Sequence, residues 1–368
     1  MFETILDTVE QDRLHARIYG ACAADVAHVL RKAHCTPDDF PTLISPAAAE
    51  FLETMAARSR QLTTLRFGKA VRLYAPLYIS NECVNACAYC GFNMRNDTPR
   101  TTLSLEQVLA EADVLHRQGF RHLLLVSGEH RGFVPVAFIS GIARQLRETF
   151  AGLSIEVYPM ETADYDVLAA SGITGIAVYQ ETYDRARYAA LHNGPKADFS
   201  YRLATPERAA RAGLRELGIG ALLGLSDHRT DLALLALHAG YLMKTFWQAR
   251  ISISFPRIRQ AAGNFVPSET VTDRQLAQAV FALRLVLPDA ELVLSTRESQ
   301  QFRDGMAGLG ITRMSAGSRT NPGGYSIAEK ALEQFAVDDC RNAAEVAAML
   351  DRKGLEPVWK DFDRCFLA

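Results

Sequence analysis

Short apolar stretches recur along this chain, and most of them precede a longer stretch with helical periodicity. Each apolar stretch is rich in β-branched and aliphatic residues and is nearly continuous. This pattern is typical of strands that are covered on both faces, as in parallel sheets. The eight predicted strands are residues 71–80, 121–128, 154–160, 175–180, 218–224, 250–255, 291–296 and 312–316.

Helical stretches with recognisable starts separate these strands. Residues 104–118 open with a Ser-x-x-Gln capping box, which predicts the first turn of a helix. Pro206 is placed to open a helix over residues 207–217, and Gly218 is expected to end it. Further helices are predicted at 227–246, 272–287 and 299–309.

Eight alternating strand–helix units predict a (β/α)8 barrel. A doubly wound open sheet is the alternative, but it usually has fewer units. Residues 1–66 look helical, most clearly at 45–60, and are expected to form an N-terminal extension. The barrel is expected over residues 67–320. Residues 321–368 open with the helix-breaking Pro322-Gly323-Gly324 and are expected to form a C-terminal extension with a polar helical tail.

Composition and charge exclude several classes of protein. The 368 residues are 48% hydrophobic and 22% charged, as in an ordinary globular protein. The 40 basic and 42 acidic residues give a net charge of −2, so no overall field favours nucleic acid or anionic lipid. No apolar run resembles a signal peptide or a membrane span. The seven cysteines are an odd number and include a tight cluster, which predicts a reducing cytoplasm rather than a disulfide framework.

Cys83, Cys87 and Cys90 form that cluster, directly after the first predicted strand. This is the C-terminal mouth of a barrel, where active sites are built. Cysteine thiolates bind iron–sulfur clusters, and three ligands leave one iron of a four-iron cluster open for catalysis. A zinc site is the structural alternative. Zinc usually takes four ligands with paired Cys-x-x-Cys spacing, and no fourth thiol or histidine lies nearby in the sequence.

The pattern Cys83-x-x-x-Cys87-x-Tyr89-Cys90 resembles the signature of the radical S-adenosylmethionine (SAM) superfamily. The resemblance implies a 4Fe–4S cluster held by the three cysteines, with SAM chelating the open iron. In that family, reductive cleavage of SAM gives a 5′-deoxyadenosyl radical that abstracts a hydrogen atom from the substrate. The cofactor carries the difficult chemistry, and the barrel binds, orients and excludes water.

The same resemblance implies cofactor-binding roles at several strand ends. Glu129 follows the second strand and is expected to meet the methionyl amino group, for which a carboxylate is a natural acceptor. Glu181, at the end of the fourth strand, is a further expected contact. Arg202, expected just before a helix, would pair with the methionyl carboxylate. Tyr89 and Phe92 are predicted cofactor contacts within the cysteine loop.

Other motifs resemble the aromatic amino acid lyase group of this superfamily. They are PLYISN at 76–81, QETY at 180–183, LGLS at 223–226, SFPR at 254–257 and STRE at 295–298. Two C-terminal motifs are similar to the tyrosine lyases of thiamine biosynthesis. They are residues 315–320 leading into PGGY at 322–325, and VWKD at 358–361.

The implied reaction breaks the Cα–Cβ bond of L-tyrosine after hydrogen abstraction at the amino nitrogen. Its products are 2-iminoacetate (dehydroglycine) and p-cresol, with 5′-deoxyadenosine and methionine from SAM. Arg297, at the end of the seventh strand, is expected to fork onto the substrate carboxylate; a salt bridge to Glu298 is its alternative. Ser315, ending the eighth strand, would contact the carboxylate or the amine. Arg257 would support the geometry of the site or replace Arg297.

The main rival is the hydrogenase-maturation type of tyrosine lyase, which carries an additional C-terminal cysteine motif for a second cluster. Here the C-terminal region offers only Cys340 and Cys365, more often structural thiols than ligands. A rival of another class is a non-enzymatic zinc-binding barrel. The resemblance further implies thiazole synthase as a protein partner and a flavodoxin or ferredoxin as electron donor. The scattered histidines show no His-x-x-x-His spacing and are expected in the core or on the surface.

Overall fold

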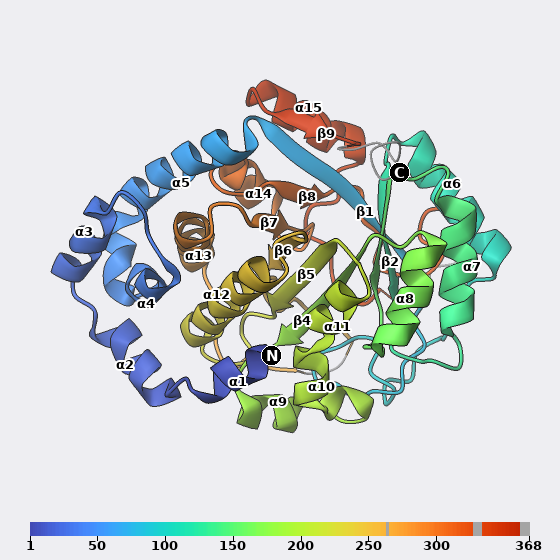
Figure 1. Cartoon of the computed structure of the whole chain (residues 1–368). Helices are drawn as coiled ribbons and strands as arrows, with labels where there is room; N and C mark the ends of the chain where they lie inside the picture. The colour runs from blue at the N-terminus through green and yellow to red at the C-terminus, as the bar shows by residue number, and fades with distance from the viewer. Residues whose placement is uncertain (263–264, 327–332, 361–368) are drawn as a thin grey trace.

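The structure is a computed structural model that describes residues 1–262, 265–326 and 333–360. Its strands run in the order β2-β3-β4-β5-β6-β7-β8-β1, and β1 also pairs with β2, so eight parallel strands close into a barrel (Figure 1). The predicted (β/α)8 barrel is therefore confirmed, and the open sheet is excluded. The strands are β1 (Ala70–Ser80), β2 (His122–Ser127), β3 (Gly152–Glu156), β4 (Gly175–Glu181), β5 (Glu216–Ala221), β6 (Arg250–Ser254), β7 (Glu291–Leu294) and β8 (Arg313–Ser315).

Helices surround these strands, and their caps follow from the sequence. The Ser104 side chain accepts a hydrogen bond from the backbone N–H of Gln107 at 3.2 Å, so the predicted capping box of α6 is confirmed. None of the described helices is long and apolar enough to cross a membrane. The helices of the barrel are α6 (Leu105–Arg117), α7 (Val136–Leu146), α8 (Thr162–Ser171), α9 (Arg185–Leu191), α10 (Phe199–Leu203), α11 (Thr205–Arg211), α12 (His228–Thr245), α13 (Asp273–Val286) and α14 (Gln300–Met306).

Two predicted boundaries were wrong. Helix α11 ends at Arg211 and β5 begins at Glu216, whereas the sequence predicted helix to residue 217. Gly213, with φ of 88°, turns the chain there, and Gly218 lies inside β5. An added Cβ at Gly218 would lie 3.2 Å from the Ala177 backbone on β4. The third strand stops at Glu156 rather than at residue 160, which places this carboxylate at the rim of the barrel.

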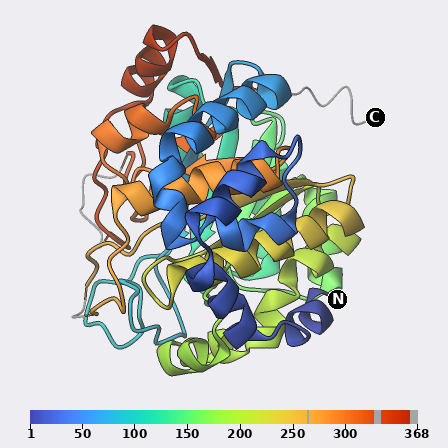
Figure 2. The same ribbon diagram turned by 90° about the vertical axis from the view of Figure 1, so that its left-hand side faces the viewer.

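The N-terminal helices pack along one side of the barrel, against α12 and α13 (Figures 1 and 2). Phe2 stacks on His238 of α12 with ring centroids 4.1 Å apart, and the Gln278 amide on α13 donates to the Leu43 carbonyl at 3.0 Å. The predicted helix at 45–60 is a 3-10 helix followed by α5. These elements are α1 (Phe2–Asp7), α2 (Gln11–Gly20), α3 (Ala23–Arg31), α4 (Phe40–Leu43), the 3-10 helix Pro46–Phe51 and α5 (Leu52–Phe67).

The C-terminal region adds a helix and a ninth strand. Helix α15 (Ala343–Arg352) buries Val346 and Leu350, and β9 (Glu356–Val358) pairs in parallel with the start of β1 outside the barrel (Figure 1). The sequence predicted the helix but not the strand. Trp359 of the 358–361 motif then packs edge-on against Phe120 at 5.3 Å. Asp361 of that motif and Cys365 lie outside the described residues.

Buried ion pairs fill the N-terminal end of the barrel. Arg72 lies 2.8 Å from Glu291 and 3.2 Å from Glu216, and Arg313 lies 3.7 Å from Glu216. Burial alone would raise the pKa of Glu216, but Arg72 and Arg313 lower it to about 2, so its charge is retained. Because these side chains occupy that end, the accessible part of the barrel interior is at the C-terminal mouth.

Candidate active site

The three cysteines lie on the loop after β1, at the C-terminal mouth, as the sequence predicted. Cys87 is buried, Cys83 and Cys90 are half-buried, and all three are free thiols. Burial raises the pKa of Cys87 to about 12 and also raises that of Cys90. Binding of a metal centre must therefore release protons from this loop, because only thiolates are ligands.

The spacing of the three sulfur atoms fits a cluster better than a single zinc ion. Among the described residues, only Asp227, His228 and Glu269 form a trio whose ligand atoms all lie within 4.8 Å of one another. Thiolates that share one tetrahedral zinc, at about 2.3 Å each, would lie about 3.8 Å apart. A four-iron cluster binds each thiolate through a different iron, so its ligands are spread more widely. The zinc alternative is disfavoured on this geometry.

Arg100 organises the cysteine loop and was missed from the sequence. Its guanidinium donates to four backbone carbonyls, those of Asn81 at 2.8 Å, Phe92 at 3.0 Å, Asn93 at 2.7 Å and Asn96 at 3.4 Å. One side chain thereby joins both ends of the loop and holds its backbone in one conformation. Four asparagines between residues 81 and 96 were the available signal that hydrogen bonds hold this loop in place, because asparagine side chains commonly bond to the backbone of loops.

The loop after β2 packs directly on the cysteine loop. A Cβ added at Gly128 would lie 2.2 Å from the Glu82 carbonyl oxygen and 3.2 Å from the Cys83 Cβ, so only glycine fits there. The backbone N–H of Val84 donates to the Glu129 carbonyl at 3.1 Å. Gly128 and Glu129 thus have different tasks. Gly128 permits the close approach of the two loops, and the Glu129 side chain extends into the site.

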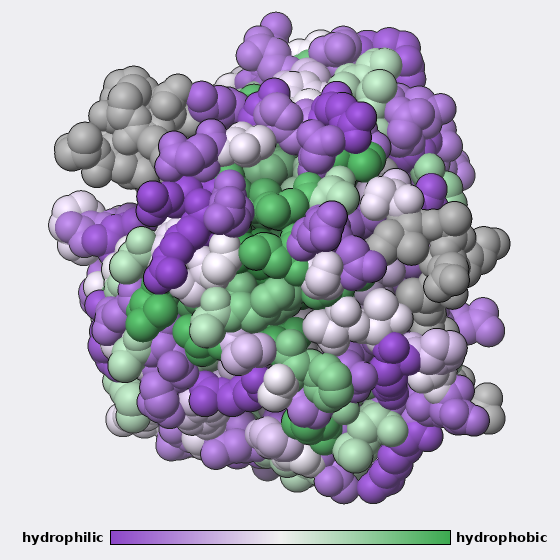
Figure 3. All heavy atoms as spheres, turned by 90° about the vertical axis from the view of Figure 1, so that its right-hand side faces the viewer, coloured by the Kyte–Doolittle hydropathy of each residue, from purple (hydrophilic) through white to green (hydrophobic). Residues whose placement is uncertain are grey.

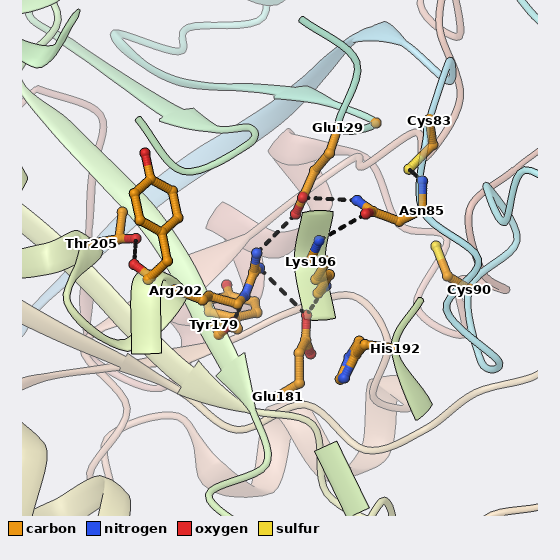
Figure 4. Close-up of polar contacts among 12 residues, drawn as sticks. Cys83, Asn85, Cys90, Glu129, Tyr179, Glu181, His192, Lys196, Arg202 and Thr205 are labelled. Atoms are coloured by element: carbon orange, nitrogen blue, oxygen red, sulfur yellow. Dashed lines mark hydrogen bonds and ion pairs between the residues drawn. The ribbon is translucent and has the colours of Figure 1, made fainter. Parts of the chain in front are cut away.

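Oppositely charged side chains alternate beside the cysteine loop (Figure 4). Arg202 Nη1 lies 2.8 Å from Glu129 Oε1, and Arg202 Nη2 lies 3.8 Å from Glu181 Oε1. Lys196 Nζ lies 2.7 Å from the same Glu181 oxygen. The Asn85 amide donates to Glu129 Oε2 at 2.9 Å, and its oxygen accepts from the Lys196 backbone N–H at 2.9 Å. This arrangement is complementary to a zwitterion, because each sign of charge is present within one small region.

These charges persist although they are buried. Burial and the nearby Arg202 would each lower the pKa of Lys196, but the Glu181 carboxylate raises it above its usual value. Burial would raise the pKa of Glu181, yet Lys196 and Arg202 lower it. Burial would lower the pKa of Arg202, but the negative charge of Glu129 has a larger effect in the opposite direction, so the pKa of Arg202 is raised. All three groups are ionised at neutral pH.

Arg202 precedes α11, which begins at Thr205, as the sequence predicted. It also lies within the short helix α10, which was not predicted and which Asp198 caps by accepting from the Tyr201 backbone N–H at 2.9 Å. Its Nε donates to the Tyr179 carbonyl of β4 at 2.6 Å, which aims the guanidinium into the site. Lys196, in the 3-10 turn Pro195–Ala197, was not predicted at all.

Glu181 occupies an unusual backbone conformation. It has φ of 71° and is the one non-glycine residue with positive φ among the described residues. The pairing of β4 with β5 also shifts register between Tyr179 and Glu181, which marks a bulge. A bulge re-aims a side chain at a strand end. Such a conformation costs about 1–3 kcal/mol and is found preferentially at functional sites.

Tyr89 and Phe92 lie on the same loop but in different surroundings. Burial lowers the pKa of His192 to about 3, and its Nδ1 donates to the Tyr188 carbonyl at 2.8 Å. The neutral ring therefore accepts from the Tyr89 hydroxyl through Nε2, also at 2.8 Å. Phe92 is buried and lies edge-on to Tyr78 at 6.0 Å, in an apolar wall against which Cys83 and Cys90 pack. Their predicted contacts with the cofactor remain predictions.

Two adjoining cavities occupy the mouth of the barrel. One is lined by Cys90, Glu181 and Lys196. The other is lined by Leu124 and Ser315 and continues toward the closed end of the barrel. The residues that line both are Glu156, Tyr179, Pro256, Arg297 and Phe335. A ligand in the deeper cavity would therefore lie next to one bound beside the cysteine loop.

Arg297 and Arg257 differ clearly in this structure. Arg297 lines both cavities, and its guanidinium carbon lies 3.3 Å from the centroid of the Phe335 ring. The alternative of a salt bridge between Arg297 and Glu298 is not observed among the described residues. Glu298 is bound instead by Arg257, at 3.1 Å from Nε, and by Arg259 at 3.0 Å. Arg297 is thus the arginine that is available to a ligand.

Ser315 lies at the end of β8 and lines the deeper cavity. Its hydroxyl oxygen accepts from the Thr296 backbone N–H at 3.0 Å, so its own proton is left to donate, either to the neighbouring Tyr74 oxygen or to a ligand. The hydroxyl therefore suits a carboxylate held by Arg297 better than an ammonium group. Its role as a substrate contact remains a prediction.

Comparisons with known proteins agree with this geometry. Residues 77–236 match the Radical SAM superfamily model, and residues 254–356 match the Biotin and Thiamin Synthesis associated domain. The chain is 46% identical over 357 residues to the 2-iminoacetate synthase of Salmonella typhimurium, covering 96% of this chain and 95% of that one. The chain belongs to the 2-iminoacetate synthase family. The 2-iminoacetate synthase of Escherichia coli is 45% identical with the same coverage.

Solved structures extend this result to the fold of the family. The FeFe-hydrogenase maturase HydG from Carboxydothermus hydrogenoformans superposes with a TM-score of 0.90 at 30% identity, covering 98% of this chain and 86% of that one. Methylornithine synthase superposes with a TM-score of 0.73 at 22% identity, which shows a shared fold only. As a radical SAM enzyme of the 2-iminoacetate synthase family, the protein uses a 4Fe–4S cluster and SAM, as the sequence predicted.

Proposed function

We propose that this protein is a 2-iminoacetate synthase, a radical SAM lyase that cleaves the Cα–Cβ bond of L-tyrosine. Its products are 2-iminoacetate, for thiazole formation in thiamine biosynthesis, and p-cresol. The observation that carries the proposal is the similarity to 2-iminoacetate synthases over 96% of the chain. The adjoining cavities support it, because a ligand bound in one of them would lie next to the cysteine loop.

The residues beside the cysteine loop are assigned to the cofactor. Cys83, Cys87 and Cys90 would hold the cluster, and together with SAM it supplies the radical that abstracts hydrogen from the substrate. Glu129 is suited to the methionyl ammonium group and Arg202 to the methionyl carboxylate, because each offers charge-assisted hydrogen bonds of the right sign. Glu181, fixed by its bulge, completes the polar contacts on this side.

The deeper cavity is assigned to tyrosine. Arg297 would fork onto the substrate carboxylate, and Ser315 would donate to the same group. Pro76, Leu124 and Val126 give this cavity apolar walls that suit an aromatic ring. The protein would thus hold the amino acid end near the cofactor and the ring toward the closed end of the barrel.

The cellular context also belongs to the proposal. Free thiols that bind an iron–sulfur cluster require a reducing compartment, so we place the protein in the cytoplasm. A thiazole synthase is the proposed recipient of 2-iminoacetate, which is reactive and gains from direct transfer. A flavodoxin or ferredoxin is the proposed electron donor, because SAM cleavage consumes one low-potential electron. The match to the Biotin and Thiamin Synthesis associated domain is consistent with this setting.

Anaerobic reconstitution tests the proposal. The protein should bind about four irons per chain and, with SAM, a reductant and tyrosine, should release p-cresol. Cys87→Ser is the matched control and should abolish p-cresol formation. Absence of p-cresol from the reconstituted wild type would refute the function. About eight irons per chain would instead indicate a second cluster and a hydrogenase-maturation enzyme.

A further inference from the structure

Glu156 stands out among the acidic residues of the site because its carboxylate has no protein partner. It is the last residue of β3 and lines both cavities, between the cysteine loop and Ser315. Neither a hydrogen bond nor an ion pair reaches its side chain from any described residue. Glu129 and Glu181, the other two carboxylates of the site, are each paired with a cation.

The surroundings of Glu156 raise its pKa to near neutral, so both its protonated and its ionised forms are populated at about pH 7. Burial is the largest influence on its pKa, and the Glu181 charge acts in the same direction. Arg297, and more weakly Lys196 and Arg202, act in the opposite direction, and the resulting pKa is about 7. The other titratable groups near Glu156 are the hydroxyls of Tyr74, Tyr78 and Tyr179. Burial is the main cause that raises the pKa of each of these tyrosines. The cavity therefore contains one carboxyl group able to exchange a proton near neutral pH.

The proposed reaction has a proton to remove. A free amino acid arrives as a zwitterion, and its ammonium nitrogen has no lone pair to stabilise a radical. Loss of a hydrogen atom from nitrogen is favourable only after the nitrogen has become a neutral amine. A base must therefore take one proton before the hydrogen atom is abstracted. This requirement rests on the proposed function, because only a reaction at the amino nitrogen imposes it.

We propose that Glu156 is the general base that deprotonates the substrate ammonium group. One N–H bond of the ammonium breaks, its electron pair stays on nitrogen, and a new O–H bond forms on the Glu156 carboxylate. The geometry favours this role because Arg297 lines the same two cavities. A carboxylate held by Arg297 carries its α-amino group only one carbon away, and Glu156 lines the cavities in which that group would lie. The neutral amine is then left beside the cavity that adjoins the cysteine loop.

The protein offers no better candidate base in these cavities. Lys196 is already protonated, and the Glu181 carboxylate is paired with it and has a lowered pKa, so neither accepts a proton readily. His192 is neutral, but its Nε2 already accepts from Tyr89. Glu156 combines a free oxygen with a position in both cavities. The phenol hydroxyl of the substrate is the competing partner for this carboxylate, and the experiment below separates the two.

The test compares Glu156→Gln with wild type in the reconstituted enzyme, over a range of pH. The amide keeps the size and the hydrogen-bonding ability of the side chain but cannot take a proton. At pH 7 we expect p-cresol formation to fall by about 10²- to 10⁴-fold, the usual contribution of a general base. The rate of the variant should rise as the pH increases, because tyrosine then enters already neutral at nitrogen. The wild-type rate should level off above about pH 7, once Glu156 is ionised.

Controls keep the result specific to Glu156. Iron content and SAM affinity should match wild type in Glu156→Gln, and Glu156→Asp should recover part of the rate because it restores a base. Glu106→Gln, an exposed glutamate on α6, should behave as wild type. A wild-type rate and pH profile in Glu156→Gln would overturn the inference. So would a loss that is equal at all pH values with weaker tyrosine binding, which would indicate a contact with the phenol. No p-cresol from wild type would overturn the proposed function and this inference together.

Discussion

Arg202 on α10 and Glu129 after β2 form a buried salt bridge across the site, with 2.8 Å between Nη1 and Oε1 (Figure 4). The two side chains come from parts of the chain 73 residues apart. Each is mostly shielded from water, so each depends on the other or on a ligand for compensation of its charge. A zwitterionic methionyl group would offer each of them a partner of the opposite sign.

Replacement of either residue should therefore weaken SAM binding without loss of the cluster. Glu129→Gln and Arg202→Lys each remove or weaken a charge-assisted hydrogen bond, worth about 1.5–3 kcal/mol, or roughly ten- to a hundred-fold in affinity. Equilibrium binding of SAM to the reconstituted variants measures this, and iron content provides the control. Wild-type affinity in both variants would remove the pair from the cofactor site.

Arg297→Ala should separate substrate recognition from cofactor binding. Loss of the guanidinium leaves a substrate carboxylate unpaired in a partly desolvated cavity, at a cost of about 3–5 kcal/mol, so p-cresol formation should fall at least a hundred-fold. SAM affinity should be retained. Arg297→Lys should recover only part of the rate, because an ammonium group cannot fork onto a carboxylate. Rapid p-cresol formation by Arg297→Ala would show that another group holds the carboxylate.

Gly128→Ala should displace the cysteine loop, because Gly128 lies in the loop after β2 that packs against it. The added methyl group would overlap the Glu82 carbonyl and contact Cys83, so the loop must move. We expect a lower iron content after reconstitution and a lower rate in proportion. Gly141→Ala is the matched control, because Gly141 lies within α7 and a Cβ added there would have no neighbouring atom within 4 Å. That change should raise stability by about 0.5–1 kcal/mol and leave iron content unchanged. Equal iron content in both variants would contradict the proposed close packing.

His238 should make the protein less stable in mild acid. Burial lowers its pKa to about 3, whereas an unfolded histidine has a pKa of about 6.5. Between these values the unfolded state binds the proton and the folded state does not, so stability falls as the pH drops below 6.5. At pH 5.5 the loss is about 1.4 kcal/mol relative to neutral pH.

Thermal midpoints at pH 7.5 and 5.5 measure this effect. The drop between the two pH values should be smaller in His238→Asn than in wild type, although the variant is less stable at both. His34→Asn, at an exposed position, should show the wild-type drop. An unchanged drop in His238→Asn would mean that other groups cause the acid sensitivity.

The sequence predicted those features that are local in the chain. Cys83, Cys87 and Cys90 lie on one short loop, so their spacing is visible directly. The apolar runs of the barrel strands are visible for the same reason, because both faces of each strand are buried. The ninth strand was not predicted, since β9 is only three residues long and depends on pairing with the start of β1.

Other features depend on contacts that the sequence does not display. Lys196 reaches Glu181 only because a short turn brings it over the end of β4. Glu156 was not predicted as a site residue, because the third strand was predicted to run to residue 160. Glu156 was therefore expected inside the strand, whereas it is the last residue of β3. Arg257 and Arg297 became distinguishable only when Glu298 was seen to bind Arg257.

Mass spectrometry of a reaction run in D2O with unlabelled tyrosine tests the central claim most directly. The amino hydrogens exchange with solvent, whereas the hydrogens on Cα and Cβ do not. Abstraction at nitrogen predicts 5′-deoxyadenosine with one added deuterium and an equal amount of p-cresol. 5′-Deoxyadenosine without deuterium, or deuterated 5′-deoxyadenosine without any p-cresol, would contradict a lyase that acts through the amino group of tyrosine.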